Sequence, residues 1–263
     1  MSSPLAPSCD LVVSVVSHGH GMLLDELLRD LVRVGAQRIC RVVVTLNLPG
    51  EPAPHIDVAW PFAVQVRRNI RPQGFGTNHN QALAGATEGC ICILNPDVRL
   101  RAVDADPFSG LVAAAVQSGT GCAYPIQLDE QGLIQDSERE LPSPKALWRR
   151  RVLGQTQARV DWVNAACLVI ATPVWQKVGG FDERYFMYCE DVDLSLRLRL
   201  LGLRLVRAPV SVIHAGQRAS HRRIQHLAWH VRSLLRLWFS PVYRQAKLML
   251  PMDTSPRRTI GPS

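Results

Sequence analysis

The chain has 263 residues, 47% of them hydrophobic, which is enough to bury one large core or one domain with an appendage. Its apolar runs are too short to span a bilayer, and Met1–Asp10 lacks a basic segment followed by an apolar one, so we expect neither a membrane span nor a secretory signal. The net charge of +8 belongs to the end of the chain, because residues 215–263 hold nine Arg or Lys against the single acid Asp253, and such a basic tail indicates an anionic partner.

Residues 11–94 alternate between strand-like and helix-like patterns. Apolar and β-branched runs predict four strands, at Leu11–Ser17, Arg41–Leu46, Ala63–Arg67 and Cys90–Leu94. Leucines at helical spacing predict a helix over Met22–Val34 that Gly35 stops, and Thr77 or Asn78 is expected to cap a second helix through Thr87. This order favours an α/β fold with a mostly parallel sheet flanked by helices. Ligands of such sheets bind beyond the carboxyl ends of the strands, so we expect the chemistry in the loops after Val16, Leu46, Val66 and Leu94.

Residues 107–239 are less regular. Helices are predicted at Pro107–Ser118, Glu190–Leu201 and Arg218–Phe239, and a short one opens at Thr172-Pro173 and closes at Gly179-Gly180. The remaining predicted segments are a polar, Arg-rich loop at Ser137–Gln157 and strands at Asp161–Ile170 and Arg204–His214. The last helix is amphipathic, with one apolar face made of Ile224, Leu227, Ala228, Val231, Leu234, Leu235 and Trp238. We therefore divide the chain into a domain at 1–214, with halves near 1–100 and 101–214, and a basic helical tail at 215–263.

The seven cysteines make an odd number, and Cys9, Cys90, Cys92 and Cys167 lie in or beside apolar runs. We interpret these four as reduced core residues of a cytoplasmic protein and not as a disulfide framework. No Cys/His spacing is typical of a structural zinc site.

Two acidic segments stand at the ends of predicted elements. Asn95-Pro96-Asp97 follows a buried strand, where a carboxylate can hold a hard cation together with diphosphate oxygens, although the same residues also make a good turn. Glu190-Asp191-Val192-Asp193 begins a helix, where the helix dipole stabilises acids. Glu190 and Asp193 share a face and Asp191 points elsewhere, which allows one exposed base beside structural or binding carboxylates.

Two further features carry weaker signals. His214 ends an apolar strand and is either a metal ligand or a polar residue at a strand end. Gly74–Asn80 is a glycine-rich turn into a helix, whose N–H groups can approach phosphates or a sugar. Each of these features is weak evidence when taken alone.

Taken in order and spacing, these segments resemble the bacterial family-two glycosyltransferases, and in particular their rhamnosyltransferase-like members. The resemblance runs from about Leu11 to about Leu237. The segments that carry it are Asn69 with Gly74–Asn80, Leu94–Asp97, Asp161–Ala166, the highly specific Val178–Leu194, and His214. It implies a GT-A fold, a nucleoside-diphosphate sugar donor, and transfer with inversion in cell-surface polysaccharide biosynthesis.

The resemblance also implies roles by position. Asp97 resembles the last residue of the family's metal-binding Asp-x-Asp motif, with Asn95 in place of the first Asp, and His214 resembles the downstream ligand, so bound Mg²⁺ or Mn²⁺ is implied. Asp191 resembles the catalytic base, with Glu190 beside it in the acceptor site. The residues expected to contact the donor are Ser17, His18, Asn69, Gly74, Gly76, Asn78, Asn95 and Asp97.

The chain departs from the family pattern at two places. Thr45-Leu46-Asn47 stands where Asp-Asn is usual after the second strand, which affects recognition of the base. Ala165 replaces a common glycine, which predicts a tighter acceptor pocket. An aspartate with an ordinary pKa of about 4 is ionised at neutral pH, so we expect Asp191 to act as the base without tuning.

The resulting functional prediction is transfer of L-rhamnose from dTDP-rhamnose to a lipid-linked saccharide. The alternative is a catalytically silent glycosyltransferase-like scaffold of a polysaccharide assembly complex, because the nucleotide-loop departures are compatible with decay. A sugar nucleotidyltransferase normally needs a glycine- and basic-rich loop directly after the first strand, and Ser17–Gly21 lacks the Lys or Arg. The tail shows no recognisable nucleic-acid motif, so no nucleic-acid partner is expected.

Three interpretations of the basic amphipathic helix remain open. It fits a peripheral enzyme at the inner face of the cytoplasmic membrane, with Arg222, Arg223, Arg232 and Arg236 near anionic headgroups. It fits equally well a helix that packs its apolar face on the domain and leaves its arginines in solvent. An exposed apolar face on this helix would also suit a homodimer.

Overall fold

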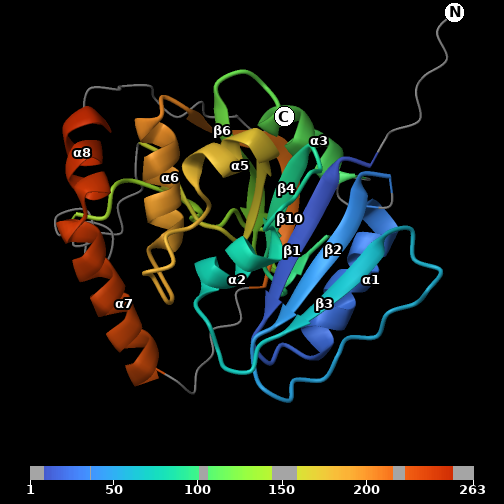
Figure 1. Cartoon of the computed structure of the whole chain (residues 1–263). Helices are drawn as coiled ribbons and strands as arrows, with labels where there is room; N and C mark the ends of the chain where they lie inside the picture. The colour runs from blue at the N-terminus through green and yellow to red at the C-terminus, as the bar shows by residue number, and fades with distance from the viewer. Residues whose placement is uncertain (1–8, 36, 101–105, 144–158, 216–222, 251–263) are drawn as a thin grey trace, which may run out of the picture.

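A mixed eight-stranded sheet forms the centre of the computed structural model, which describes residues 9–35, 37–100, 106–143, 159–215 and 223–250 (Figure 1). From one edge to the other, the strands are β3 (Ala63–Arg68), β2 (Ile39–Leu46), β1 (Leu11–Ser17), β4 (Cys90–Leu94), β9 (Cys167–Ala171), β6 (Thr120–Leu128), β10 (Arg204–His214) and β5 (Val98–Arg99). The first four are parallel, and β9 runs antiparallel to both β4 and β6. Strand β10 is parallel to β6 and antiparallel to β5. One sheet therefore contains strands from both predicted halves of the domain.

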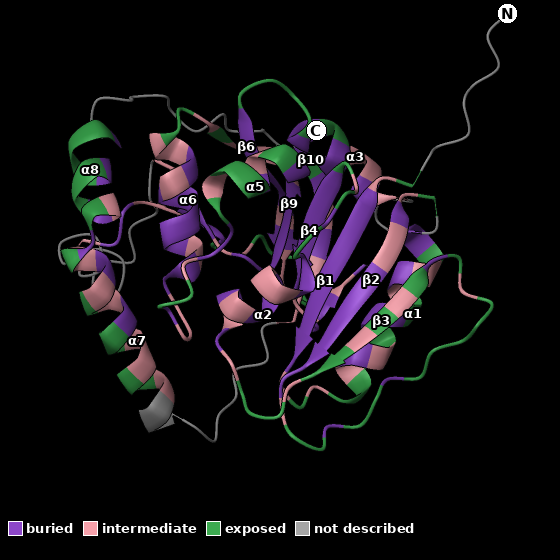
Figure 2. Cartoon of the chain, viewed as in Figure 1, coloured by how far each residue is buried: buried purple, intermediate pink, exposed green. Residues whose placement is uncertain are grey.

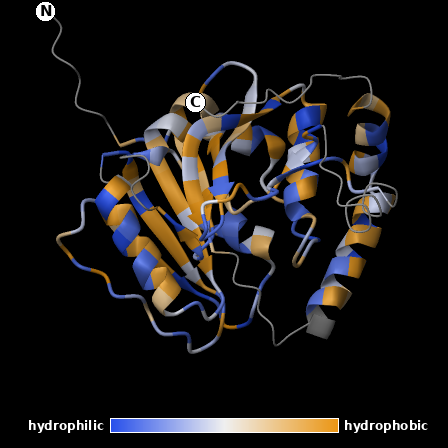
Figure 3. Cartoon of the chain, turned by 180° about the vertical axis from the view of Figure 1, so that it is seen from behind, coloured by the Kyte–Doolittle hydropathy of each residue, from blue (hydrophilic) through white to orange (hydrophobic). Residues whose placement is uncertain are grey.

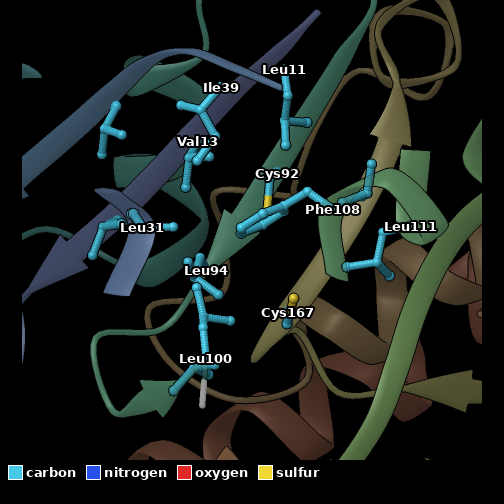
Figure 4. Packing of buried hydrophobic residues seen from close by; sticks show 14 of the residues in the cluster. Leu11, Val13, Leu31, Ile39, Cys92, Leu94, Leu100, Phe108, Leu111 and Cys167 are labelled. Atoms are coloured by element: carbon cyan, nitrogen blue, oxygen red, sulfur yellow. The ribbon is translucent and has the colours of Figure 1, made fainter. Parts of the chain in front are cut away.

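Helices cover both faces of this sheet, as expected for strands that are buried on both sides (Figure 2). Helices α1 (Met22–Gly35) and α3 (Pro107–Ala115) pack on one face, where Phe108 lies among Cys92, Cys167 and the leucines shown in Figure 4. Helices α2 (Phe75–Ala82), α5 (Thr172–Val178) and α6 (Glu190–Leu200) pack on the other face. Successive residues of β1 enter opposite cores, because side chains alternate along a strand. The predicted GT-A-like α/β arrangement of a mostly parallel sheet flanked by helices is confirmed.

The C-terminal helices α7 (Arg223–Phe239) and α8 (Pro241–Met249) stand beside α6 at one end of the molecule (Figure 1). A third apolar cluster joins Leu237, Tyr243 and Ala246 of these helices to Val192 and Leu196 of α6. Among the residues that the structure describes, no helix is both long and apolar enough to cross a membrane.

The structure divides the predicted apolar face of α7 between the domain and solvent, and Leu234 and Trp238 of that face pack against the third apolar cluster. The helix packs on the domain through Ser233 and Leu237, both buried. Leu227, Val231 and Leu235 of the predicted apolar face are exposed, and Figure 3 shows apolar residues alternating with polar ones along the helix. The predicted start at Arg218, and Arg222, lie outside the described residues, as do 251–263. Helix α8 was not expected, although Ser240 caps it and Pro241 begins it.

Two predictions of local structure are wrong. The expected strand Asp161–Ile170 is two short strands in different sheets, because β8 (Trp162–Val163) pairs with β7 (Glu138–Arg139) and only residues from Cys167 onward join the main sheet. Thr77 and Asn78 lie inside α2, which begins after Gly74 and ends at Ala82. The physical reason is that the Phe186 carbonyl accepts the Phe75 N–H, so the first helical turn is satisfied without a side-chain cap.

The loop and cysteine predictions are confirmed with exceptions. The predicted loop Ser137–Gln157 contains the short strand β7, and its residues 144–158 lie outside the described part. All seven cysteines are free, and Cys90, Cys92 and Cys167 are buried as expected. Cys9 is exposed, so its assignment to the core is wrong.

Candidate active site

A cavity of about 200 Å³ lies at the carboxyl ends of β1, β2 and β4, where the sequence places the chemistry. One wall is mostly polar and comes from the loops after these strands, and the other comes from the segment before α6 and from α7. The lining residues are Val16, His18, His20, Asn47, Gln73, Phe75, Asn95, Pro96, Asp97, Phe186, Met187, His226 and Trp229. Three predicted donor-contacting residues, His18, Asn95 and Asp97, are therefore on its wall.

Strand pairing brings Asp97 and His214 together, although 116 residues separate them in sequence. Asn95-Pro96-Asp97 makes a turn in which the Val98 N–H donates to the Asn95 carbonyl. The two-residue strand β5 then pairs antiparallel with the end of β10 and places His214 opposite Val98. As a result, Asp97 Oδ1 lies 3.4 Å from His214 Nε2.

The electrostatics of this pair favour an ionised carboxylate. Burial raises the pKa of Asp97, but His214 and His20 more than offset it and hold that pKa below its ordinary value. Burial lowers the pKa of His20 in spite of Asp97 and Glu51 nearby, so His20 is neutral at pH 7. Nδ1 of His214 is buried without a hydrogen-bond partner among the described atoms.

One carboxylate and one imidazole are a suitable donor set for Mn²⁺ or Mg²⁺ if other ligands complete the shell. No group of three or more His, Cys, Asp or Glu side chains in the described ranges is placed to hold a metal ion. The residues present therefore fit an ion that is shared with a ligand's own oxygens, as when a diphosphate and water supply the remaining contacts. They do not form a closed structural metal site.

Glu51 holds the loops after β1 and β2 together, and the sequence analysis missed it. Its buried carboxylate accepts hydrogen bonds from the Ser17 hydroxyl, from the Gly19 N–H at 2.9 Å and from the Leu48 N–H at 3.3 Å. Nothing local in the sequence indicates this role, because Glu51 stands in a turn-rich loop. The structure places Ser17 in this buried support of the cavity and not on its wall.

A network of amides supports the other side of the cavity. Asn47 Oδ1 accepts from the Asn69 amide at 2.8 Å and from the Gln73 N–H at 2.9 Å, while its Nδ2 donates to the Gln73 carbonyl at 3.0 Å. Asn69 also donates to the buried Asn78 at 2.7 Å. Asn47 and Gln73 line the cavity, whereas Asn69 and Asn78 lie behind them. The departure at Thr45-Leu46-Asn47 thus supplies the central residue of an ordered network.

The glycines of the predicted phosphate-binding turn pack against the segment before α6. A Cβ atom at Gly74 would lie 3.0 Å from the backbone of Phe186, and one at Gly76 would lie 2.6 Å from the side chain of Phe181. Because the first helical N–H also donates to the Phe186 carbonyl, this turn is closed by protein. Close packing is sufficient to explain both glycines, and their contact with a donor remains a prediction.

Asp191 and Glu190 stand at the first turn of α6, after an unusual stretch of backbone. Tyr188 and Cys189 have φ values of 70° and 65°, a left-handed conformation that costs a non-glycine residue about 1–3 kcal/mol and occurs most often at functional sites. The three acids have different surroundings: Glu190 and Asp193 are buried, and Asp193 pairs with Arg197 at 2.6 Å. Asp191 is partly exposed, which agrees with the expected separation of one accessible base from supporting carboxylates.

The pKa values of the two adjacent carboxyls, Glu190 and Asp191, are both raised. Burial raises the pKa of Glu190 well above its ordinary value, and the negative charge of Asp191 raises it further. Burial also raises the pKa of Asp191 to about 6, although the Val192 N–H, Arg139 and the Ala165 N–H favour its charged form. This corrects the expectation of an ordinary pKa near 4, because the sequence does not reveal the burial. With a pKa of about 6, Asp191 carries the negative charge of this pair at pH 7, while burial and that charge favour the protonated form of Glu190.

One short segment connects Asp191 to the turn that carries Asp97. The Ala165 N–H lies near Asp191 and favours its charged form, and the carbonyl of the next residue, Ala166, accepts from the Asn95 N–H at 2.8 Å. Asn164 fixes this segment by exchanging hydrogen bonds with the Gln127 amide. Asp191 does not line the cavity that contains Asp97. Asp191 and the Asn95–Asp97 turn nevertheless both lie beside the segment Asn164–Ala166.

Several wall residues were not predicted. His20 accepts the His18 N–H at 2.8 Å, and its place three residues beyond the end of β1, which reaches the cavity, is a signal that was available. The rings of Phe186 and Trp229 are in tilted contact with centroids 5.0 Å apart, and Tyr188 hydrogen-bonds to His226 at 2.7 Å. These contacts bring α7 into the site, which helical periodicity alone did not indicate.

Comparison with known proteins finds two rhamnosyltransferases that align with 85% of the chain. No family model matches the chain. It is 28% identical to N-acetylglucosaminyl-diphospho-decaprenol L-rhamnosyltransferase of Mycobacterium tuberculosis over an alignment that covers 85% of this chain and 82% of that protein. It is 27% identical to the rhamnosyltransferase WbbL of Escherichia coli K12, over 85% of this chain and 90% of WbbL.

Solved structures support the fold. The mannosyltransferase PcManGT from Pyrobaculum calidifontis, in complex with GDP-Man and Mn²⁺, superimposes with a TM-score of 0.60 at 15% identity, covering 94% of this chain and 76% of that one. At this identity, the likeness concerns the fold. The chain is thus a homologue of rhamnosyltransferases over most of its length and has the fold of GT-A glycosyltransferases.

Proposed function

We propose that this chain is a metal-dependent, inverting glycosyltransferase of cell-surface polysaccharide biosynthesis. It would transfer a sugar, L-rhamnose from dTDP-rhamnose, to a hydroxyl of a lipid-linked saccharide. The names of the two relatives support the sugar and the lipid-linked acceptor, and the nucleotide sugar and Mn²⁺ in the PcManGT complex support the donor class. The observation that carries the proposal is the Asp97–His214 pair, whose side chains lie 3.4 Å apart and whose aspartate lines the cavity at the strand ends.

Asp97 and His214 provide the donor end of this site. They would hold Mn²⁺ or Mg²⁺, which when bound supplies positive charge that stabilises the departing diphosphate. Asn47 and Gln73 present amide groups on the same wall, beyond the ends of β1 and β2, where they can orient the nucleotide. Glu51 and the amide network fix these groups before the donor arrives, so little reorganisation is needed on binding.

Asp191 provides the acceptor end. Its carboxylate accepts the proton of the acceptor hydroxyl as that oxygen attacks the anomeric carbon from the face opposite the diphosphate. A pKa of about 6 makes Asp191 a stronger base than an ordinary aspartate while it remains ionised at pH 7. Burial and the charge of Asp191 favour the protonated form of Glu190, which would add no second negative charge beside the base. A single displacement without a covalent intermediate inverts the configuration, and the site needs one base for it.

The exposed face of α7 supports attachment to a membrane surface on the cytoplasmic side. Leu227, Val231, Leu235 and Phe239 form an apolar stripe on this helix, each at least 45% exposed. Residues 223–250 contain five basic residues and no acid, a combination typical of helices that lie in the interface of an anionic bilayer. The enzyme would then meet a lipid-linked acceptor at the surface where that lipid resides.

Substitution of Leu235 by Asp tests this attachment. It should reduce binding to phosphatidylglycerol vesicles in a flotation assay and leave the melting temperature unchanged, because Leu235 is exposed. If the stripe joins two copies of the chain instead, the same variant converts a dimer into a monomer in sedimentation and binds vesicles as the unsubstituted chain does.

Donor binding can be tested by thermal stabilisation with a panel of nucleoside diphosphates and their sugars, with and without Mn²⁺. A ligand present at a hundred times its Kd stabilises the folded state by about 2.7 kcal/mol. We expect stabilisation by one nucleotide series that needs Mn²⁺ and is lost in Asp97→Ala and in His214→Ala. Absence of stabilisation by every nucleotide would refute the proposal and favour the silent scaffold.

A further inference from the structure

A second concavity adjoins the candidate active site. It is a groove of about 310 Å³ between α7 and the segment before α6, lined by Arg184, Phe186, Trp229, Arg232, Ser233 and Arg236. It shares Phe186 and Trp229 with the cavity that contains Asp97, so this pair of tilted aromatic rings is the wall between the two spaces. The donor-binding and catalytic roles assigned above use neither Arg232 nor Arg236.

The groove is strongly basic. Three of its six lining residues are arginines, and none is acidic. Arg184 is neutralised by Asp182, with which it forms a two-pronged ion pair. Within the described part of the chain, Arg232 and Arg236 form no ion pair with a carboxylate, so their charges remain available to a ligand. Guanidinium groups bind phosphate oxygens through paired N–H donors, which makes Arg the preferred residue for this task.

The groove is also fixed relative to the catalytic acids. The Ser233 hydroxyl donates to the Met187 carbonyl at 2.7 Å, and the chain runs from Met187 through the left-handed residues Tyr188 and Cys189 to Glu190 and Asp191. Trp229, Arg232 and Arg236 lie one helical turn apart on α7 and so face the same side. The segment that leads from Met187 to Asp191 therefore fixes the position of α7 and of its three groove residues.

We propose that this groove binds the phosphate or diphosphate group through which the saccharide acceptor is attached to its lipid. This inference rests on the proposed function and names the part of the acceptor that is recognised. The acceptor sugar would pass over the Phe186–Trp229 pair toward the base. The prenyl chain would leave along the exposed stripe of Val231, Leu235 and Phe239, which lies on the outer side of the same helix.

The test measures binding and turnover separately. The binding probe is N-acetylglucosamine joined through a diphosphate to a short, water-soluble prenyl chain, titrated by tryptophan fluorescence without a donor. A short-chain alkyl N-acetylglucosaminide without phosphate is the matched probe for turnover. The variant is Arg232→Ala with Arg236→Ala, and its control is Arg244→Ala with Lys247→Ala, which removes two exposed charges from α8 outside the groove.

We expect the groove variant to weaken binding of the diphosphate probe about ten- to hundredfold, since each charged contact is worth about tenfold and neighbouring contacts are not additive. Turnover of the phosphate-free acceptor should change less than twofold, and the α8 control should bind the diphosphate probe normally. Arg232→Lys with Arg236→Lys should bind more weakly than the unsubstituted chain and more tightly than the alanine variant, because it keeps the charge and loses the paired donors.

Three results would overturn the inference. Equal weakening by the groove variant and the α8 control would mean that diffuse charge binds the probe. Unchanged probe binding together with reduced binding of phosphatidylglycerol vesicles would assign the groove to bulk lipid headgroups. Unchanged binding in both assays would leave the groove without this ligand. Each of these results concerns the groove alone, because turnover of the phosphate-free acceptor reports on the proposed transferase activity independently.

Discussion

Substitution of Asp191 by Asn should stabilise the protein at pH 8 while it removes the proposed catalytic base. Burial raises the pKa of this carboxyl from 3.8 to about 6 in the folded state. A group that binds its proton more tightly in the folded state makes the protein less stable when it ionises. The free energy of unfolding therefore falls as the pH rises from about 4 to about 6, and it stays at the lower value above that range. Asn carries no charge and avoids this penalty, and its Oδ1 can still accept the Val192 N–H, which lies 2.8 Å from Asp191.

The expected size follows from the pKa difference. A rise of about two units at about 1.4 kcal/mol per unit corresponds to about 3 kcal/mol, and coupling to Glu190 makes this an upper value. We therefore expect Asp191→Asn to raise the free energy of unfolding by about 1–3 kcal/mol at pH 8 and by almost nothing at pH 4.

Urea unfolding at several pH values between 4 and 8 measures this effect, with circular dichroism as the readout. The exposed Glu130→Gln, in the turn after β6, is the control for a carboxylate outside the site and should show no pH-dependent gain. If Asp191→Asn is no more stable than the unsubstituted chain at pH 8, or if its gain is the same at pH 4 and pH 8, the buried-base argument is wrong.

The remaining predictions concern catalysis and packing. The kcat/KM of transfer should fall about tenfold per pH unit below about pH 6, because Asp191 must be ionised; a profile that stays flat from pH 5 to pH 8 would exclude it as the base. Gly180→Ala should lower the free energy of unfolding by about 3 kcal/mol, since this residue has φ +69° and its new Cβ would collide with Asn80. Gly179→Ala, at φ +75° with no atom within 4 Å of its Cβ, should cost about 1 kcal/mol; equal losses for the two in urea unfolding would contradict the packing argument.

The strands could be predicted from the sequence where an apolar run has clear ends. Strands β1, β4 and β10 begin and end at the expected residues, because turn-forming or polar residues bound each run. The run Asp161–Ile170 misled the prediction, since periodicity cannot show that Asn164 bonds to Gln127 and that the sheet changes at this point. Helix α8 was missed although Ser240-Pro241 is a recognisable helix start.

The residues of the candidate site could be predicted from the sequence where an acidic residue or a histidine follows or ends a predicted strand. Asp97 and His214 meet as expected, since each stands at the end of a strand that reaches the same edge of the sheet. The supporting residues were not predictable, because Glu51 and the aromatic wall from α7 act through contacts between distant segments. The same holds for the pKa of Asp191, which depends on burial, and for the outward direction of the apolar face of α7, which depends on how the helix docks.

The most direct test of the proposed function is sugar transfer by the purified chain with Mn²⁺, dTDP-rhamnose and a diphosphate-linked N-acetylglucosamine acceptor, with the product's anomeric configuration read by NMR. The proposed mechanism predicts a product whose configuration is opposite to that of the donor, and a rate about 10²–10⁴ times lower in Asp191→Asn. Transfer with retained configuration, or an Asp191→Asn variant as fast as the unsubstituted chain, would contradict it.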